Sequence, residues 1–347
     1  MISKVSIVKC TDTTVQTKVG QAMELAGWKN FIKPRSRVAL KPNLGWDLFM
    51  PGSITSPWVV EGVIKTIQDY VEELFIVESD QVLENVEKSF LKSGINRLCQ
   101  KYNVTWVNMS KNKYKMVRVK GGRIFKEIKI PEILLETDII TIPVMKTHNK
   151  SILSGAIKNQ WGCIDKLRHN YHLVLDDALA EINSILKPKF SVVDATVCLE
   201  GNGPKSGIPK IMDLILASGD IVAVDAIQAK IMGFNPSTID HLRTAHEKGL
   251  GEYLPANIET VGENINECLE AFIPAKHNLV SFIEMSLRKS SFKKLFFDTF
   301  LFLFALIGAK IWYYLWYYGL GKGLKRKKRI LQKSRYGDQW IERKNSA

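Results

Sequence analysis

The amino-acid sequence predicts an α/β protein with a mainly parallel sheet flanked by helices, followed by a C-terminal hydrophobic membrane helix or hairpin. Short apolar and β-branched runs alternate with segments of helical period from residue 5 to about residue 250. Charged or amide side chains directly follow several of these runs, as at the carboxyl ends of parallel strands. Residues 295–321 are almost wholly apolar and long enough to cross a bilayer as a helix.

The composition is that of a folded protein, because 46% of the 347 residues are hydrophobic and 24% are charged. Five scattered cysteines, without any Cys-x-x-Cys, argue against a disulfide framework. No basic and apolar leader opens the sequence, so we expect a cytoplasmic protein. The expected units are an α/β domain over 1–270, with a division into two lobes near residue 200 left open, a linker over 271–290, a membrane-associated segment over 291–321 and a basic tail over 322–347.

The first third of the sequence predicts three strands and the helices between them. An apolar run at 5–8, a helix over 14–31 and a run at 37–40 indicate a parallel βαβ unit. Ser56 before Pro57 predicts the N-cap of a helix over 57–71. Next come a strand at 74–78, a helix over 83–98, a strand at 104–107 and a hairpin within 114–128.

The middle of the sequence centres on a buried strand predicted at 139–144, which ends at Lys146-Thr147-His148. A solvated turn would explain the same polar residues, so the segment alone leaves both interpretations open. Asp220 predicts the N-cap of a helix over 221–232. The other expected elements are a helix over 173–186, strands at 190–195 and 213–217, and a helix over 238–248.

Four strand ends share charged or amide residues: Lys41 with Asn43, Glu78 with Asp80, Lys146 with His148, and Asp194 with Glu200. The carboxyl ends of parallel strands meet at one edge of a sheet, so these groups predict a single cleft for an anionic ligand. The candidate catalytic residues are Lys146, His148, Lys158 and Asp194. The candidate substrate-binding residues are Lys41, Asn43, Asn159, Glu200, Gly201, Gly203 and Lys205.

A divalent metal is left open as a cofactor, and the candidate ligands are Asp194, Glu200, His172 and Asp225. The glycine-rich segment 200–207 is either an anion-binding loop or an ordinary connection between strands. A strand is predicted after it, whereas Rossmann and Walker loops open a helix, so neither fingerprint is met.

Several short motifs, taken in order, resemble the bacterial and archaeal family known as domain of unknown function three-six-two, over residues 5–260. They are Lys41-Pro42-Asn43, the segment 143–148, the segment 155–159 with Gly162, Val193-Asp194-Ala195, Glu200-Gly201-x-Gly203-Pro204, and Gly219-Asp220 with Val224-Asp225-Ala226. Many members of that family carry a ferredoxin-like, cysteine-rich module. This chain lacks those cysteines, so we expect no iron–sulfur cluster.

A fainter resemblance links residues 153–159, with His172 downstream, to a Gly-x-Lys segment and a later histidine of nickel-pincer lactate racemases. In that family the lysine holds the cofactor and the histidine ligates the metal. The resemblance implies that Lys158 anchors a cofactor or an anionic substrate.

The apolar segment has basic residues on both sides. Ten lysines and arginines against two acids follow it between residues 322 and 344, which is +8 of the formal charge of +14. A single crossing would place the stronger basic flank outside the cell, against the positive-inside rule. We therefore favour a re-entrant hairpin or an interfacial helix that contacts lipid through residues 291–329.

The sequence thus predicts a protein on the cytoplasmic face of the cell membrane, leaning towards an enzyme with an anionic small-molecule substrate that is phosphorylated, carboxylated or lipid-linked. The reaction class is not encoded in any motif we find. A non-catalytic ligand sensor or scaffold is the alternative. Without the signature of a nucleic-acid-binding fold, no sequence-specific nucleic-acid binding is expected.

Overall fold

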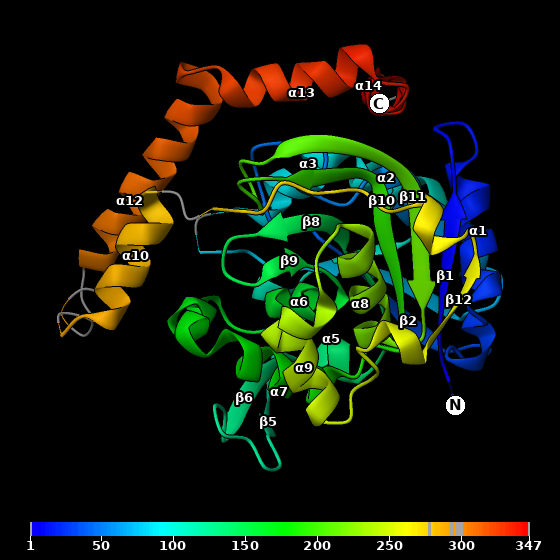
Figure 1. The fold of residues 1–347 in the computed structure, drawn as a ribbon, viewed down its shortest axis with the longest axis horizontal. Coiled ribbons are helices and arrows are strands. Elements are labelled where there is room, and N and C mark those ends of the chain that lie inside the picture. The colour runs from blue at the N-terminus through cyan, green and yellow to red at the C-terminus, as the bar shows by residue number, and fades with distance from the viewer. Residues whose placement is uncertain are drawn as a thin grey trace.

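The computed structural model describes residues 2–345 apart from 83, 277–278, 292–294, 296 and 298–300 (Figure 1). Its strands are β1 (Ser3–Lys9), β2 (Arg37–Pro42), β3 (Glu73–Glu78), β4 (Thr105–Asn108), β5 (Tyr114–Arg118), β6 (Glu127–Pro131), β7 (Asp138–Ile142), β8 (Val144–His148), β9 (Ile152–Ser154), β10 (Phe190–Glu200), β11 (Ile208–Ser218) and β12 (Ile258–Gly262).

The α-helices of the body are α1 (Val15–Leu25), α2 (Pro57–Ile67), α3 (Val86–Ser93), α4 (Ile95–Tyr102), α5 (Glu132–Leu135), α6 (Ala156–Asn159), α7 (Leu175–Leu186), α8 (Ile221–Ile231) and α9 (Asp240–Glu247). Towards the C-terminus follow α10 (Leu279–Lys289), α12 (Leu301–Tyr314), α13 (Lys322–Lys333) and α14 (Tyr336–Asn345).

One large sheet runs in the order β12-β1-β11-β10-β7-β2-β3-β4, and β8 adds to it by pairing with β10 and β9. The pairs from β10 through β7, β2 and β3 to β4 are parallel, whereas β11 is antiparallel to both of its neighbours. The predicted α/β class with a mainly parallel sheet is confirmed. Residues 200–207 connect β10 and β11, which are neighbouring strands of this one sheet.

Helices cover both faces of the sheet, which gives two hydrophobic cores. Residues of α6, α7, α8 and α9 pack on one face. Residues of α1, α2, α3 and α4 pack on the other, together with aromatic side chains from beyond residue 315. Because both faces are buried, the central strands are apolar runs rather than alternating ones.

The C-terminal end of the strand predicted at 139–144 is wrong, because β7 ends at Ile142. Pro143 separates β7 from β8, because proline has no N–H group to continue the ladder. Lys146, Thr147 and His148 therefore lie inside β8 and not in a turn after a strand, and all three are buried.

Three other predictions need correction. The helix expected over 83–98 is broken at Gly94, which has φ +81°, and its predicted start at residue 83 lies outside the described residues. Ser56 stands at the N-cap of α2, but its side chain makes no capping hydrogen bond. Finally, β1 and β2 are not neighbours in the sheet, since β11, β10 and β7 lie between them.

The predicted hairpin is confirmed, because β5 and β6 pair antiparallel around Gly121 and Gly122. The Asp220 cap is also confirmed. Its carboxylate accepts hydrogen bonds from the backbone N–H groups of Val222 and Ala223, both at 2.9 Å. The helix that begins at residue 221 is α8, as expected from this cap.

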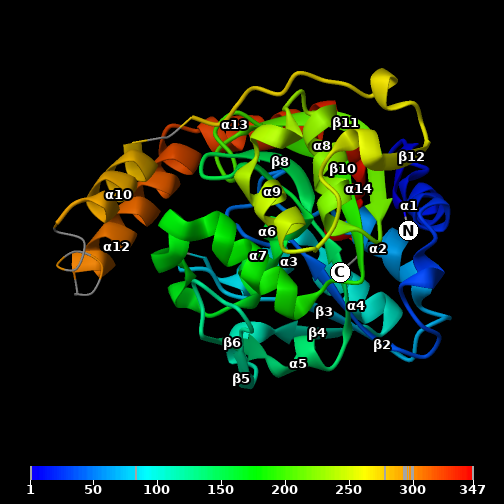
Figure 2. The ribbon, with the colours of Figure 1, turned by 60° about the horizontal axis from the view of Figure 1, so that its bottom comes forward.

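At the C-terminal end, α10 and α12 lie side by side and project from the body in both views (Figures 1 and 2). The chain from Leu301 to Gly319 is a helix long and apolar enough to cross a membrane, and only 11% of its apolar window is buried. Residues 292–294, 296 and 298–300 of the predicted membrane-associated segment 291–321 lie outside the described residues.

The basic residues that follow form α13 and α14, which return to the body. Tyr336 is fully buried, its ring stacks on that of Trp58 at 5.1 Å, and its hydroxyl donates to Asp213 at 2.8 Å. Trp340 also packs edge-on against Trp58, with 4.3 Å between ring centroids. Residues on both sides of the apolar helix are therefore fixed to the same α/β body.

Because Trp340 is 3% exposed in the second core, Trp340→Ala should lower the free energy of unfolding by about 3–5 kcal/mol. Denaturant unfolding of the full chain, followed by circular dichroism, measures this change. Asp338→Ala, an exposed position on the same helix, is the matched control and should leave the unfolding midpoint unchanged. Equal stability of both variants would contradict the docking of α14.

Candidate functional site

A cleft of about 450 Å³ lies at the carboxyl ends of β2, β3 and β8, and α10 and α12 close one side of it. The predicted residues that line it together are Lys41, Asn43, Lys146, His148, Lys158, Asn159, His172 and Lys205. This position is the one that open α/β sheets use for ligands.

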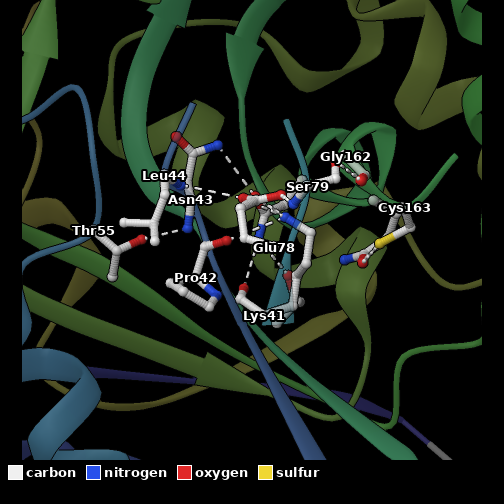
Figure 3. Close-up of polar contacts among 12 residues, drawn as sticks. Lys41, Pro42, Asn43, Leu44, Thr55, Glu78, Ser79, Gly162 and Cys163 are labelled. Carbon is white, nitrogen blue, oxygen red and sulfur yellow. Dashed lines mark hydrogen bonds and ion pairs between the residues drawn. The ribbon is translucent and has the colours of Figure 1, made fainter. Parts of the chain in front are cut away.

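The floor of the cleft is a buried ion pair between two neighbouring strands (Figure 3). The Lys41 ammonium lies 2.8 Å from Glu78 Oε2, and the two side chains are 1% and 4% exposed. Glu78 also accepts hydrogen bonds from the backbone N–H groups of Leu44 and Ser79. With these three contacts, the Glu78 carboxylate ties the loop after β2 to the end of β3.

Asn159 joins this floor to the next strand. Its amide nitrogen donates to the Lys41 carbonyl and to the Thr141 hydroxyl, both at 2.9 Å. Its amide oxygen accepts from Asn43 at 3.2 Å. The backbone at Gly162 packs closely against this floor. A Cβ atom at that position would stand 2.7 Å from Glu78 Oε1. We conclude that Asn159 positions other residues of the cleft.

Lys146 is buried beside this floor. Its ammonium donates to Asn43 Oδ1 at 2.9 Å and to the Ser53 carbonyl at 2.6 Å. Burial, reinforced by the positive charge of Lys158, lowers the pKa of Lys146 to about 7. A lysine with such a pKa exchanges between ammonium and amine at neutral pH.

Lys158 has a different environment. Its ammonium lies over the ring of Trp161, 5.8 Å from the centroid. Within the part of the chain that the structure describes, no acceptor lies within hydrogen-bond distance of this ammonium. Burial and the neighbouring charge of Lys150 lower the pKa of Lys158 to about 7. Its amine lone pair is therefore free for chemistry when the group is neutral.

His148 is held as a neutral imidazole. Burial, together with the charge of Lys158, keeps the pKa of His148 well below its usual range. The backbone N–H of Lys150 donates to His148 Nδ1 at 3.0 Å, which places the ring proton on Nε2. His148 is therefore a hydrogen-bond donor through Nε2 in this arrangement and is poorly suited to accept a proton there.

Six cationic side chains line the cleft: Lys41, Lys146, Lys150, Lys158, Arg168 and Lys205. Three of them have carboxylate partners. The ion pairs are Lys41 with Glu78, Lys150 with Glu284, and Lys205 with Glu84. For Lys146, Lys158 and Arg168, no carboxylate of the described residues lies within ion-pair distance. The cleft therefore carries an uncompensated positive charge, which favours an anion.

Asp194 and Asp225 do not line the cleft. Asp194 accepts hydrogen bonds from the backbone N–H of Ser56 at 2.7 Å and from Thr196. Asp225 accepts from the backbone N–H groups of Ala156 and Ile157 at 2.6 and 2.9 Å, so it fixes the start of the segment that carries Lys158. Both are fully buried. Each carboxylate thus holds backbone in place.

The glycine-rich segment packs against the end of β8. Thr147 donates through its hydroxyl to the Gly201 carbonyl at 2.9 Å, and a Cβ on Gly203 would collide with the Thr147 carbonyl oxygen. Lys205 reaches the cleft, where Glu84 pairs with it and Tyr313 lies under it. Glu200 lies outside the lining and contacts Lys210 and the backbone N–H of Ile273.

His172 lies at the border between body and α10. Its Nδ1 is 3.1 Å from Glu284 Oε1 and 2.8 Å from the Lys150 ammonium. Among the described residues, no group of three or more His, Cys, Asp or Glu is placed to hold a metal ion. The four candidate metal ligands are thus spread over separate places, and we derive no step through a metal or a nickel cofactor.

Sequence reasoning missed several residues of the lining, among them Lys150, Trp161, Arg168, Glu284 and Tyr313. Arg168 is 2% exposed and donates to the backbone carbonyls of Ile164 and Asp80, which no local pattern indicates. A signal did exist for Trp161, because it lies two residues after the Lys158-Asn159 motif. Glu284 and Tyr313 come from the segments predicted as linker and membrane anchor.

The chain belongs to the family described as Domain of unknown function (DUF362), whose model matches residues 38–230, more than half of the sequence. The expected family is confirmed. The match extends from β2 to α8 and includes the six lining cations. The chain is also similar to a thylakoid-associated protein of Synechocystis sp., with 28% identity, covering 65% of this chain and 72% of the relative.

Two solved structures are similar over part of the chain. One is a protein from Thermotoga maritima, with 13% identity and a TM-score of 0.36, covering 55% of this chain and 51% of that one. The other is the lactate racemase apoprotein from Thermoanaerobacterium thermosaccharolyticum, with 12% identity and a TM-score of 0.39, covering 63% and 54%. The chain spans little more than half the length of these structures.

Competitive acetylation of the full chain should show Lys146 and Lys158 titrating near pH 7. Lys158→Met should raise the pKa of Lys146, because the Lys158 charge is the main electrostatic cause of its lowering. Peptide mass spectrometry between pH 5 and 11 measures both effects. An unchanged Lys146 profile in this variant, with Lys129→Met as control, would contradict the coupling.

Proposed function

We propose that this protein is an enzyme that acts on an anionic small molecule, phosphorylated or carboxylated, bound in the cleft. The observation that carries the proposal is the set of three buried cations, Lys146, Lys158 and Arg168, without carboxylate partners among the described residues. Unpaired buried charge is costly to keep in a folded protein, and such charge is characteristic of binding and catalytic sites. An anionic group of the substrate would supply the missing counter-charge.

The environments of the three groups suggest different roles. Arg168 and Lys146 are fixed by hydrogen bonds to backbone or amide oxygens, so they are suited to hold the anionic group. The Lys158 group has no such acceptor among the described residues. When protonated it adds to the counter-charge for the anionic group, and when neutral it is suited to take a proton or to attack a carbonyl. His148 would donate through Nε2 to an oxygen on which negative charge develops.

A ligand sensor or scaffold would use the same cleft without turnover. Incubation of the full chain with a metabolite library, read by mass spectrometry, separates the two functions. Loss of a substrate in wild type and not in Lys158→Met supports the enzyme. A ligand that raises the melting temperature without being consumed supports the sensor.

We also propose that the hairpin of α10 and α12 attaches the protein to the cytoplasmic face of a membrane. Its support is the outer face of α12, where Leu303, Ile307 and Ile311 are 58%, 47% and 55% exposed. A single crossing is disfavoured because α14 packs on the same body from which α10 departs. The relative named as thylakoid-associated is consistent with a membrane location.

Anion binding should weaken as the pH rises. Sulfate keeps a fixed charge, so its affinity follows the protonation of Lys146 and Lys158, whose pKa values are about 7. Between pH 7 and pH 8 the charged fraction of each lysine falls from about one half to about one tenth, which weakens binding by about fivefold per lysine. Calorimetric titration measures the effect. Lys158→Met should flatten the profile, Lys129→Met should preserve it, and pH-independent affinity would contradict the proposal.

Membrane binding should depend on the outer face of α12. Ile307→Glu combined with Ile311→Glu should reduce co-sedimentation with anionic vesicles at least tenfold, because charged groups are costly in the hydrocarbon region. Leu91→Glu, at a position 61% exposed on α3, is the matched control and should bind like wild type. Undiminished sedimentation of the double variant would exclude the hairpin as the anchor.

A further inference from the structure

The apolar residues of α12 form two stripes on opposite faces of the helix. Those that line the cleft are Phe302, Ala305, Leu306, Ala309 and Tyr313, which lie on one face of the α-helix. The stripe with Leu303, Ile307 and Ile311 points away and is exposed. A helix that only anchored the protein would need the outer stripe alone.

The inner stripe gives the cleft a hydrocarbon wall opposite its cations. Along α10 and α12, Glu284 is the one charged side chain among the described residues that lines the cleft, and Lys150 and His172 already engage it. Leu287 extends the same apolar wall from α10. One side of the cleft therefore suits an anionic group, and the other suits an alkyl chain.

The size of the cleft supports the same conclusion. Its volume of about 450 Å³ lies within the range of roughly 300–1,000 Å³ that is typical of sites for drug-sized ligands. A bare phosphate would occupy a small part of it and would leave the inner stripe of α12 in contact with water. An attached chain would cover Leu306 and Ala309 and remove their apolar surface from water.

We infer that the ligand is a single-chain amphiphile, with a phosphate or carboxylate head on Lys146, Lys158 and Arg168 and a hydrocarbon chain along the inner stripe of α12. The inference rests on the proposed anion-binding function of the same cleft and adds the chemical class of the substrate. Since α12 also carries the outer apolar stripe, the hydrocarbon chain of the ligand would reach the cleft from the lipid side without crossing water.

The test is equilibrium dialysis of the full chain in lipid nanodiscs against methyl, butyl, hexyl and octyl phosphate, with empty nanodiscs to subtract partition into lipid. Affinity should rise about three- to fourfold for each added CH₂ that is buried. Hexanoate and octanoate show whether a carboxylate head is accepted. Octyltrimethylammonium, with the same chain and the opposite charge, should not bind in the cleft.

Two variants of α12 test where the hydrocarbon chain of the ligand lies. Ala309→Phe fills the inner side of the cleft, so it should weaken octyl phosphate at least tenfold while methyl phosphate binds as in wild type, which also shows that the variant is folded. Ile307→Phe, on the outer stripe, should change neither affinity.

The outcomes separate the two proposals. Methyl phosphate that binds as tightly as octyl phosphate would overturn the amphiphile and leave the anion site standing. The amphiphile inference would also be overturned if octyl phosphate and octyltrimethylammonium bound with equal affinity and Lys158→Met changed neither. That result would show that both compounds partition onto the exposed hairpin. If no anion binds and sulfate also fails, the anion site itself is wrong.

Discussion

The ion pair of Lys41 and Glu78 is the interaction on which the cleft depends. It joins the ends of β2 and β3 in an environment with little water, and removal of one partner from such a pair costs roughly 3–5 kcal/mol. Since Glu78 also holds the backbone at Leu44 and Ser79, the pair sets the path of the loop after β2. That loop supplies Asn43 and the Ser53 carbonyl, which orient Lys146. Lys146 is thus oriented by a loop that this buried pair holds in place.

Much of the α/β fold and a part of the candidate site, chiefly its lysines, could be predicted from the sequence. Runs such as 37–40 and 74–78 are buried on both faces, so they were recognisable as central strands. Lys41, Lys146 and Lys158 were found because charge directly after or within an apolar run is conspicuous. The order of strands was not predictable, because β1 pairs with β11 and β12, which lie more than 200 residues away in the chain.

The carboxylates show why residue type alone is not enough. Asp194 was expected to be catalytic and Asp225 to be a candidate metal ligand, and in the structure both accept hydrogen bonds from backbone N–H groups. Their chemistry is the same in either role, and only the direction of the side chain distinguishes them. Local sequence also gave no reason to connect Glu284 with Lys150, 134 residues apart, since that contact exists only after α10 has folded back.

The return of the chain to the body has a consequence for biogenesis. A segment that crosses a bilayer once requires the polar residues after it to be carried across. Here the basic residues beyond the apolar helix lie in or beside α13 and α14, and Ile330, Tyr336 and Trp340 from these two helices are part of the second core. In the proposed membrane attachment, the protein finishes folding on one side before the hairpin of α10 and α12 enters lipid, so this insertion would need no translocation of charge.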